Sequence, residues 1–282
     1  MPREVPVNGI DAADRGTLVH RALEDVWRLL GNRDRLAAKT PEELLALVSS
    51  AVSGAVSAMA RIRPNTFAGK LADMETDRLR ELVITWLKTD AARSFFEVEE
   101  SEKRMTIDIA GIRISTVADR IDRLANDRRV IIDYKTGNVS LTDWFSERIA
   151  EPQLPLYCLA MEDAPAGVLL GRVKKGAMKY AGIADDETIA EGVKAVADDG
   201  SLNDRFSCVA DIVSCWREAL ERIAGELAAG WAAVSPVSVN KSCRYCHLKG
   251  VCRIGERSGY QIGEEAGEEA GRMDGHGEDE IS

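Results

Sequence analysis

Apolar residues recur with helical spacing over the first third of the chain. Residues 16–31 carry one apolar stripe, which predicts an amphipathic helix. Thr40 and Pro41, followed by two acidic residues, are typical of a capped helix start and predict a second helix over residues 40–62. A third helix is predicted over residues 70–93.

Near residue 95 the spacing of apolar residues changes to that of strands. Strand-like segments with short polar breaks lie at residues 95–102, 104–110, 112–124 and 129–134. They are followed by a short helix at 151–162, two strands within 166–182 and a long helix at 209–233. This order predicts an α/β fold: a mixed central β-sheet flanked by helices, preceded by an N-terminal helical region.

Composition agrees with one globular domain and an acidic tail. The chain has 282 residues, of which 45% are hydrophobic, and a net charge of −10. Residues 256–282 hold nine acidic and two basic residues and many glycines, so we expect a disordered tail. The remaining body is nearly neutral, which leaves room for basic patches and a nucleic-acid partner.

We therefore expect a single domain over residues 1–255, with a helical part at 16–93, a catalytic core at 95–233 and a cysteine segment at 240–255. No apolar run reaches the roughly 18–20 residues of a membrane helix, and the N-terminus lacks a secretory pattern. The expected location is the cytoplasm, without a membrane partner.

The end of the strand at residues 129–134 carries the most informative chemistry. Asp133 and Lys135 lie two residues apart directly after three apolar residues, so both side chains share one face of the strand. A carboxylate and an ammonium at a strand end suit metal-assisted phosphodiester chemistry, in which Lys135 orients an attacking water or stabilises charge on the phosphate.

Hairpin geometry places a second carboxylate beside the first. If residues 125–127 form a three-residue loop, Asp119 lies opposite Asp133, with Cβ atoms about 4.5–5.5 Å apart. Two carboxylates at this distance repel unless a cation lies between them, and Mg²⁺ binds such pairs. The alternative is a pair of solvated acids, neutralised by Arg120, Arg123 or Lys135.

Three further polar residues are candidates for the same site. His20 shares a helical face with Gly16 and Glu24, and it offers an imidazole nitrogen to a metal. Gln153 and Tyr157 lie one turn apart on the short helix and suit contacts to phosphate or sugar oxygens. Taken singly, each is more typical of an ordinary structural or surface residue.

Three cysteines lie within ten residues near the C-terminus. Cys243, Cys246 and Cys252 are spaced so that three thiolates can surround one centre, which suits an iron–sulfur cluster or zinc. With zinc, His247 is a possible fourth ligand. The other cysteines are expected in the core: Cys158, Cys208 and Cys215.

Together these residues resemble the RecB-like nucleases of the PD-(D/E)XK superfamily, most closely the C-terminal nuclease domain of AddB-type DNA-repair proteins. The similar segments occur in the family's order: Gly-x-x-x-His at 16–20, Ala-Asp-Arg-Ile-Asp at 118–122, Asp-Tyr-Lys at 133–135, Gln-x-x-x-Tyr at 153–157, and the three cysteines. The resemblance covers about residues 10–255.

The resemblance implies a restriction-endonuclease-like core and a Mg²⁺- or Mn²⁺-dependent deoxyribonuclease. It further implies an exonuclease in double-strand break repair and recombination, with DNA and a helicase–nuclease subunit as partners. By the resemblance, the metal ligands are His20, Asp119, Asp133 and the backbone carbonyl of Tyr134. Lys135 is the catalytic lysine, and Gln153 and Tyr157 assist in the active site.

The cysteines resemble the end of a four-cysteine [4Fe–4S] site. The family's first cluster cysteine precedes the Gly-x-x-x-His helix, whereas residues 1–19 contain no cysteine. Either the chain is the C-terminal piece of a longer protein or the cluster is incomplete. Two other functions stay open: a CRISPR-associated RecB-like nuclease, and a non-catalytic DNA-binding or scaffold domain held by a metal cluster.

Overall fold

The computed structural model describes residues 9–137, 140–243 and 246–256. The chain divides into two compact units, Met1–Trp231 and Ala232–Ser282. The predicted disordered tail lies, apart from its first residue, outside the described residues.

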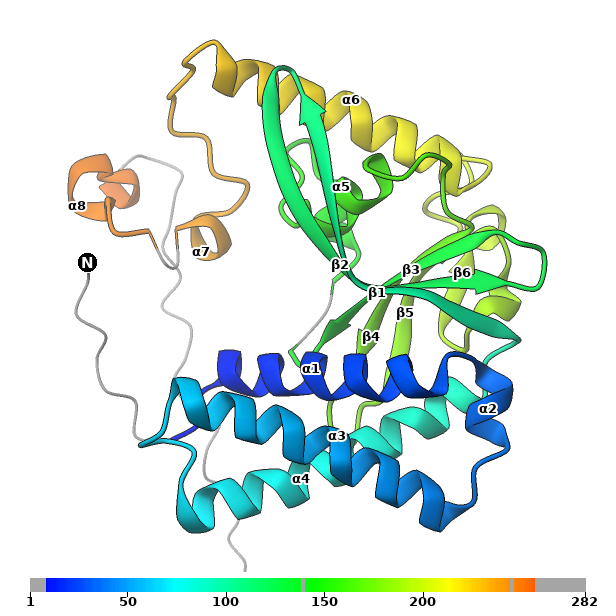
Figure 1. Cartoon of the computed structure of the whole chain (residues 1–282). Coiled ribbons are helices and arrows are strands. Elements are labelled where there is room, and N and C mark those ends of the chain that lie inside the picture. Colours follow the sequence, from blue (N-terminus) through cyan, green and yellow to red (C-terminus); the bar gives the residue numbers. More distant parts are fainter. Residues whose placement is uncertain (1–8, 138–139, 244–245, 257–282) are drawn as a thin grey trace, which may run out of the picture. The chain divides into compact units, whose positions relative to one another are not determined.

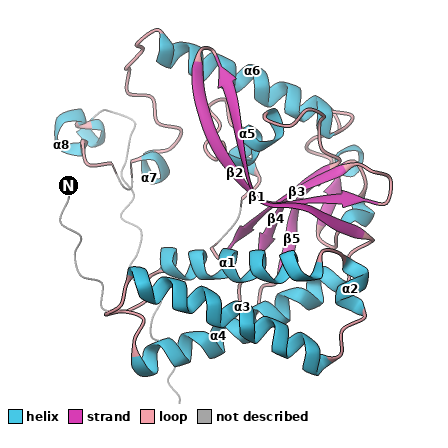
Figure 2. Cartoon of the chain, viewed as in Figure 1, coloured by secondary structure: helices cyan, strands magenta, loops and turns pink. Residues whose placement is uncertain are grey.

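The first unit is built on a six-stranded mixed sheet (Figures 1 and 2). The strands follow one another in sequence order: β1 (Phe96–Ile109), β2 (Ile112–Leu124), β3 (Arg129–Lys135), β4 (Gly167–Arg172), β5 (Lys179–Ala184) and β6 (Val193–Ala195). The β3–β4 and β5–β6 pairs are parallel, and the others are antiparallel. The long connection between β3 and β4 contains α5 (Gln153–Leu159).

Long helices cover one face of the sheet: α1 (Ala12–Leu30), α3 (Pro41–Ile62) and α4 (Gly69–Ala91), with the short α2 (Arg33–Ala37) between the first two. The local sequence fixes their ends. The Asp11 side chain accepts a hydrogen bond from the Asp14 N–H at the start of α1, and Gly31, at φ 73°, closes it. Thr40 and Glu43 form a capping box at the start of α3.

The opposite face is covered by α5 and α6 (Val209–Ala228). Alternate residues of β3 therefore enter two different hydrophobic cores. Val130, Ile132 and Tyr134 pack with the N-terminal helices, whereas Ile131 packs with α5 and α6. A buried strand with this alternation sends Asp133 and Lys135 toward α5, which carries Gln153.

The structure confirms the predicted mixed sheet flanked by helices and corrects several boundaries. The two segments predicted at 95–102 and 104–110 form one strand, β1, which is irregular at Glu102 (φ 50°). The helix predicted at 209–233 ends at Ala228. Helix α2 and strand β6 are too short to show an apolar period, and the sequence did not predict them.

Helix α3 is the one described helix that is long and apolar enough to cross a membrane, with a mean hydropathy of 1.5. The sequence analysis underestimated this stretch, because its apolar residues are mainly alanine and valine broken by serines. Its buried residues, among them Val48, Val52 and Ala55, belong to the core that α1 and α4 complete. Such packing is typical of a core helix.

The second unit contains α7 (Val239–Ser242), α8 (Lys249–Cys252) and a 3₁₀ turn at Ile254–Glu256. The unit boundary at residue 231 falls inside the domain predicted over residues 1–255, and the assignment of the cysteine segment to that domain stays a prediction.

Candidate active site

The β2–β3 register matches the one inferred from a three-residue loop. Arg123 lies opposite Arg129, and Arg120 lies opposite Ile132. Beyond that pair the Tyr134 N–H is donated to Asp119 Oδ2 at 2.7 Å. A side-chain carboxylate thus takes the place of a strand partner where the ladder ends, and it lies 8% exposed.

Helix α1 brings His20 onto this strand end. Its Nε2 lies 2.8 Å from the Tyr134 carbonyl oxygen, and its Nδ1 lies 3.3 Å from Asp119 Oδ1. Burial by itself lowers the pKa of His20, but the hydrogen bond to Asp119 and the charge of that carboxylate raise it above the ordinary value. Imidazole, carboxylate and peptide carbonyl therefore meet at one point.

Asp133 is completely buried. Lys135 Nζ lies 2.7 Å from its Oδ2, yet neither carboxylate oxygen accepts a well-aligned hydrogen bond. Burial, followed by the charge of Asp119, raises the pKa of Asp133 to about 6, while Lys135 acts in the opposite direction. Of the alternative, a solvated acid neutralised by an arginine or Lys135, the structure shows the Lys135 ion pair but not the solvation, because Asp133 is completely buried.

Lys135 also contacts the short helix α5. Its Nζ donates to Gln153 Oε1 at 3.0 Å, and Gln153 Nε2 donates in turn to the Tyr157 hydroxyl. Burial raises the pKa of Tyr157 to about 12, so the hydroxyl is neutral. The two α5 residues therefore form a chain of hydrogen bonds that ends on the Lys135 ammonium.

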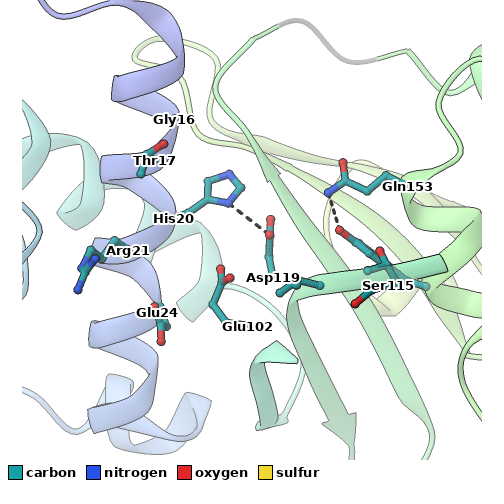
Figure 3. Close-up of a pocket in the computed structure, with 12 residues that line it drawn as sticks. Gly16, Thr17, His20, Arg21, Glu24, Glu102, Ser115, Asp119 and Gln153 are labelled. Carbon is teal, nitrogen blue, oxygen red and sulfur yellow. Dashed lines mark hydrogen bonds and ion pairs between the residues drawn. The ribbon is translucent and has the colours of Figure 1, made fainter. Parts of the chain in front are cut away.

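An open pocket of about 750 Å³ lies over these groups (Figure 3). Its walls come from α1, β1, β2 and α5. The lining residues are Gly16, Thr17, His20, Arg21, Glu24, Glu102, Ser115, Thr116, Val117, Asp119, Gln153 and Tyr157. Four of the predicted site residues line it, whereas Asp133, Tyr134 and Lys135 lie outside its lining.

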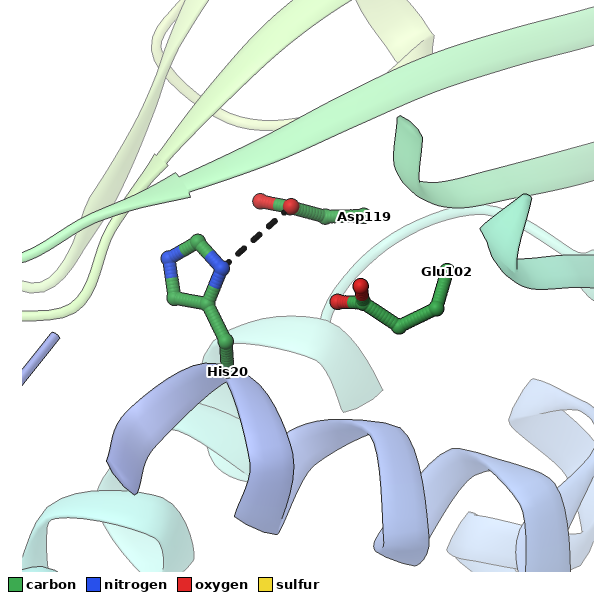
Figure 4. Close-up of side chains that lie close together, drawn as sticks. All are labelled: His20, Glu102 and Asp119. Atoms are coloured by element: carbon green, nitrogen blue, oxygen red, sulfur yellow. Dashed lines mark ion pairs between the residues drawn. The ribbon is translucent and has the colours of Figure 1, made fainter. Parts of the chain in front are cut away.

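Glu102 is a site residue that the sequence analysis did not identify. Ligand atoms of His20, Glu102 and Asp119 lie within 4.8 Å of one another, the one such group among the described residues (Figure 4). Partial burial and the neighbouring Asp119 raise the pKa of Glu102. The β1–β2 register could have revealed it, because its neighbours Ser101 and Lys103 pair with Arg120 and Ala118, across from Asp119.

This donor set fits a hard divalent cation. One imidazole nitrogen, carboxylate oxygens and a peptide carbonyl are ligands for Mg²⁺ or Mn²⁺. The buried Asp133 carboxylate, without an aligned hydrogen-bond donor, is a second indication that positive charge is needed here. Asp133 does not lie within the 4.8 Å group, since it pairs with Lys135 instead.

The cysteines of the second unit are free and half-buried. Among the described residues, Cys243, Cys246 and Cys252 do not bring three ligand atoms within 4.8 Å of one another. The iron–sulfur or zinc site, with His247 as a possible ligand, therefore stays a prediction. In the first unit Cys158 is buried in the core, Cys208 caps the start of α6 and Cys215 is half-buried within it.

Comparison with known proteins identifies one family. The sequence model of the PD-(D/E)XK nuclease superfamily matches residues 2–253. No curated protein matches the chain. A solved structure titled "Crystal structure of SSO0001" is similar at 17% identity over 88% of this chain and 87% of that one, with a TM-score of 0.31.

The buried Asp133 carboxylate yields a stability prediction. Asp133→Asn should raise the melting temperature in EDTA by a few degrees, because a neutral amide is cheaper to bury than a carboxylate without aligned donors. The same variant should lose the melting-temperature increase that Mn²⁺ gives the wild type. Thermal unfolding with and without Mn²⁺ measures both effects. Asp163→Asn, at an exposed acid, is the control, and a lower melting temperature of Asp133→Asn in EDTA would contradict the argument.

Proposed function

The chain belongs to the PD-(D/E)XK nuclease superfamily, and on this basis we propose that it is a RecB-like, AddB-type DNA exonuclease acting in double-strand break repair. The observation that carries the proposal is the meeting of His20, Asp119 and the Tyr134 peptide beside the Asp133–Lys135 pair. These are the residues that the Gly-x-x-x-His and Asp-x-Lys motifs bring from distant parts of the chain.

The residues that would hold Mg²⁺ or Mn²⁺ are His20, Asp119, Asp133 and the Tyr134 carbonyl, with Glu102 at the edge of the group. When bound, such a cation supplies Lewis-acid charge for a phosphate oxygen and lowers the pKa of a water. The pocket is open to solvent and is lined by His20, Glu102 and Asp119, so a phosphodiester can reach these three residues.

Lys135 is proposed as the catalytic lysine. Its side chain is 36% exposed, and its ammonium is held between Asp133 and Gln153. Gln153 is fixed by Tyr157, which is 1% exposed. This arrangement holds one positive charge beside the pocket-lining Gln153 rather than leaving a flexible lysine in solvent, and a charge fixed there would stabilise a phosphate or orient an attacking water.

The Gln153–Tyr157 pair also supports the RecB-like assignment. The subgroup motif Gln-x-x-x-Tyr has a physical role here, because both side chains belong to the hydrogen-bond chain that ends on Lys135. By the same resemblance we propose a helicase–nuclease subunit as partner. The competing functions are a CRISPR-associated nuclease and a scaffold without activity. Cleavage of DNA by the wild type would reject the scaffold.

A second pocket offers positive charge to the DNA backbone. It measures about 330 Å³ and is lined by Arg15, Arg78, Lys174 and Lys175 together with Thr136. The two pockets adjoin on α1, because Gly16 lines the first while a Cβ on it would lie 3.8 Å from Thr136 Oγ1. We propose that phosphates flanking the reacting one bind here.

The main test is cleavage of linear duplex DNA. The wild type with Mg²⁺ or Mn²⁺ should degrade linear DNA, leave covalently closed circles intact and stop on addition of EDTA. Lys135→Met should lower the cleavage rate by about 10²- to 10³-fold, because the positioned charge is lost. Lys194→Met, at an exposed lysine of β6, should cleave like the wild type.

The controls separate the alternatives. Circular dichroism must show that Lys135→Met is folded. Cleavage of circles would indicate an endonuclease instead of an exonuclease. DNA binding without cleavage under every divalent cation would reject the enzymatic proposal in favour of the scaffold.

DNA binding should depend on the second pocket. Lys174→Glu should weaken binding of duplex DNA severalfold in Ca²⁺ and reduce the slope of log K against log salt by about one, the loss of one phosphate contact. Lys194→Glu is the matched charge reversal and should leave that slope unchanged. Fluorescence anisotropy over a salt series measures both, and equal slopes for the two variants would rule out this DNA path.

The cysteine centre, Cys243, Cys246 and Cys252, is proposed to bind a [4Fe–4S] cluster, and zinc is the alternative. Protein purified without oxygen should be brown and contain iron and sulfide, and Cys246→Ser should lose both and unfold at a lower temperature. Cys208→Ser, at the start of α6, should keep the metal. A colourless protein with stoichiometric zinc would replace iron–sulfur by zinc.

A further inference from the structure

A cluster of buried charged side chains lies behind the candidate active site, on the side of the sheet that faces α4. Asp90, Arg93, Arg120 and Asp122 are each at most 4% exposed. Arg93 Nη1 lies 2.7 Å from Asp122 Oδ2, and Arg120 Nη1 lies 3.0 Å from Asp90 Oδ2. The proposed chemistry uses none of these four residues.

Such a cluster contributes little to the free energy of folding. Ion pairs this deeply buried cost several kcal/mol per ion in desolvation, and apolar residues of similar volume often do as well or better. A role for the cluster in holding neighbouring elements in place would explain it better than a contribution to stability.

Arg120 contacts the three elements that carry His20, Asp119 and Tyr134. It lies on β2 next to Asp119, and its Nη1 donates to the Tyr134 hydroxyl of β3 at 3.0 Å. Its guanidinium lies 4.1 Å from the ring centre of Trp27, two turns along α1 from His20. Its Nη1 also reaches Asp90 of α4.

Tyr134 links this cluster to the site. Its backbone carbonyl contacts His20 and its N–H contacts Asp119, while its hydroxyl receives the Arg120 hydrogen bond at the other end of the residue. The ring is tightly seated: a Cβ on Gly171 would lie 2.9 Å from Tyr134 Cδ1, and the Trp86 ring centre is 5.8 Å away. A displacement of the hydroxyl is therefore transmitted to the peptide.

We propose that Arg120 is a positioning residue for the metal site. It fixes the spacing between α1 and the β2–β3 strand end through Trp27 and the Tyr134 hydroxyl, so that His20, Asp119 and the Tyr134 carbonyl are held at cation-binding distance before a cation arrives. This inference rests on the proposed metal-dependent function.

The two tyrosines of the cluster provide a matched pair of variants. The Tyr134 hydroxyl bonds to Arg120, whereas the Tyr180 hydroxyl donates to Asp90 Oδ1 in the same cluster. Replacing either by phenylalanine removes one buried hydroxyl and keeps the ring. In the described part of the chain no contact joins the Tyr180 side chain to His20 or Asp119.

The experiment measures Mn²⁺ affinity of the full chain by calorimetry, together with the melting temperature in EDTA. Tyr134→Phe should weaken Mn²⁺ binding by about tenfold, the lower range for loss of a supporting hydrogen bond behind a metal ligand. Tyr180→Phe should bind Mn²⁺ within about twofold of the wild type, although its melting temperature should fall at least as much. In DNA cleavage, Tyr134→Phe should raise the half-saturating Mg²⁺ concentration while the KM for DNA at saturating Mg²⁺ is unchanged.

A second pair tests the guanidinium itself. Arg120→Lys should weaken Mn²⁺ binding more than Arg93→Lys, since Arg93 bonds to the same two acids but not to Tyr134 or Trp27 among the described contacts. If either lysine variant fails to fold, the tyrosine pair decides.

Equal Mn²⁺ affinity of Tyr134→Phe and the wild type would overturn the positioning role, and so would an equal loss in both tyrosine variants, which would indicate general loosening of the core. In both cases the wild type still binds Mn²⁺, so the nuclease proposal would stand. A wild type that neither binds Mn²⁺ nor cleaves DNA would overturn both.

Discussion

The structure of the site depends on the peptide of one residue, Tyr134. The β2–β3 ladder ends at Ile132, two residues before it, and the Tyr134 N–H is donated to the Asp119 side chain instead of a backbone carbonyl. Beyond this point β2 no longer follows β3 and continues with β1 as a long hairpin whose end contacts α6 (Figure 1). The gap that this divergence leaves between α1 and β2 is where the pocket forms. The site therefore exists because the β2–β3 ladder ends at this position.

The balance of charge around that peptide differs between the two sides of the sheet. On the α4 side, two arginines face two aspartates, and the cluster is balanced in charge. On the pocket side, carboxylates outnumber the cations, and the completely buried Asp133 lacks aligned donors. Low dielectric makes both arrangements strong, but only the second is incomplete without an added cation. The imbalance therefore marks the functional side of the strand.

Local sequence patterns predicted much of this architecture and part of the site. The capped start of α3 and the turn at residues 125–127 are fixed by neighbouring residues, so the helix and the strand register followed from them. Glu102 could have been found from the β1–β2 register. The Arg120 contacts could not, since they depend on how α1 and α4 pack against the sheet. The sequence also predicted that Asp133 and Asp119 share a cation, which stays a prediction, and it did not predict that Lys135 contacts both the Asp133 carboxylate and Gln153. Strand geometry predicts which face a side chain takes, but not which partner it meets there.

The alternation of a strand explains why the supporting residues are next to the functional ones. Asp119 turns to the pocket and Arg120 to the inner cluster; on β3, Asp133 and Lys135 turn to α5 and Tyr134 to Arg120. Asp119, Asp133 and Lys135 thus each have a supporting residue next to them in sequence, on the other face of the same two strands. Because a strand is nearly inextensible, a group fixed on one face restricts the position of its neighbour on the other. A site built this way needs few contacts of its own, and it can leave its pocket open to a large substrate while its side chains stay in place.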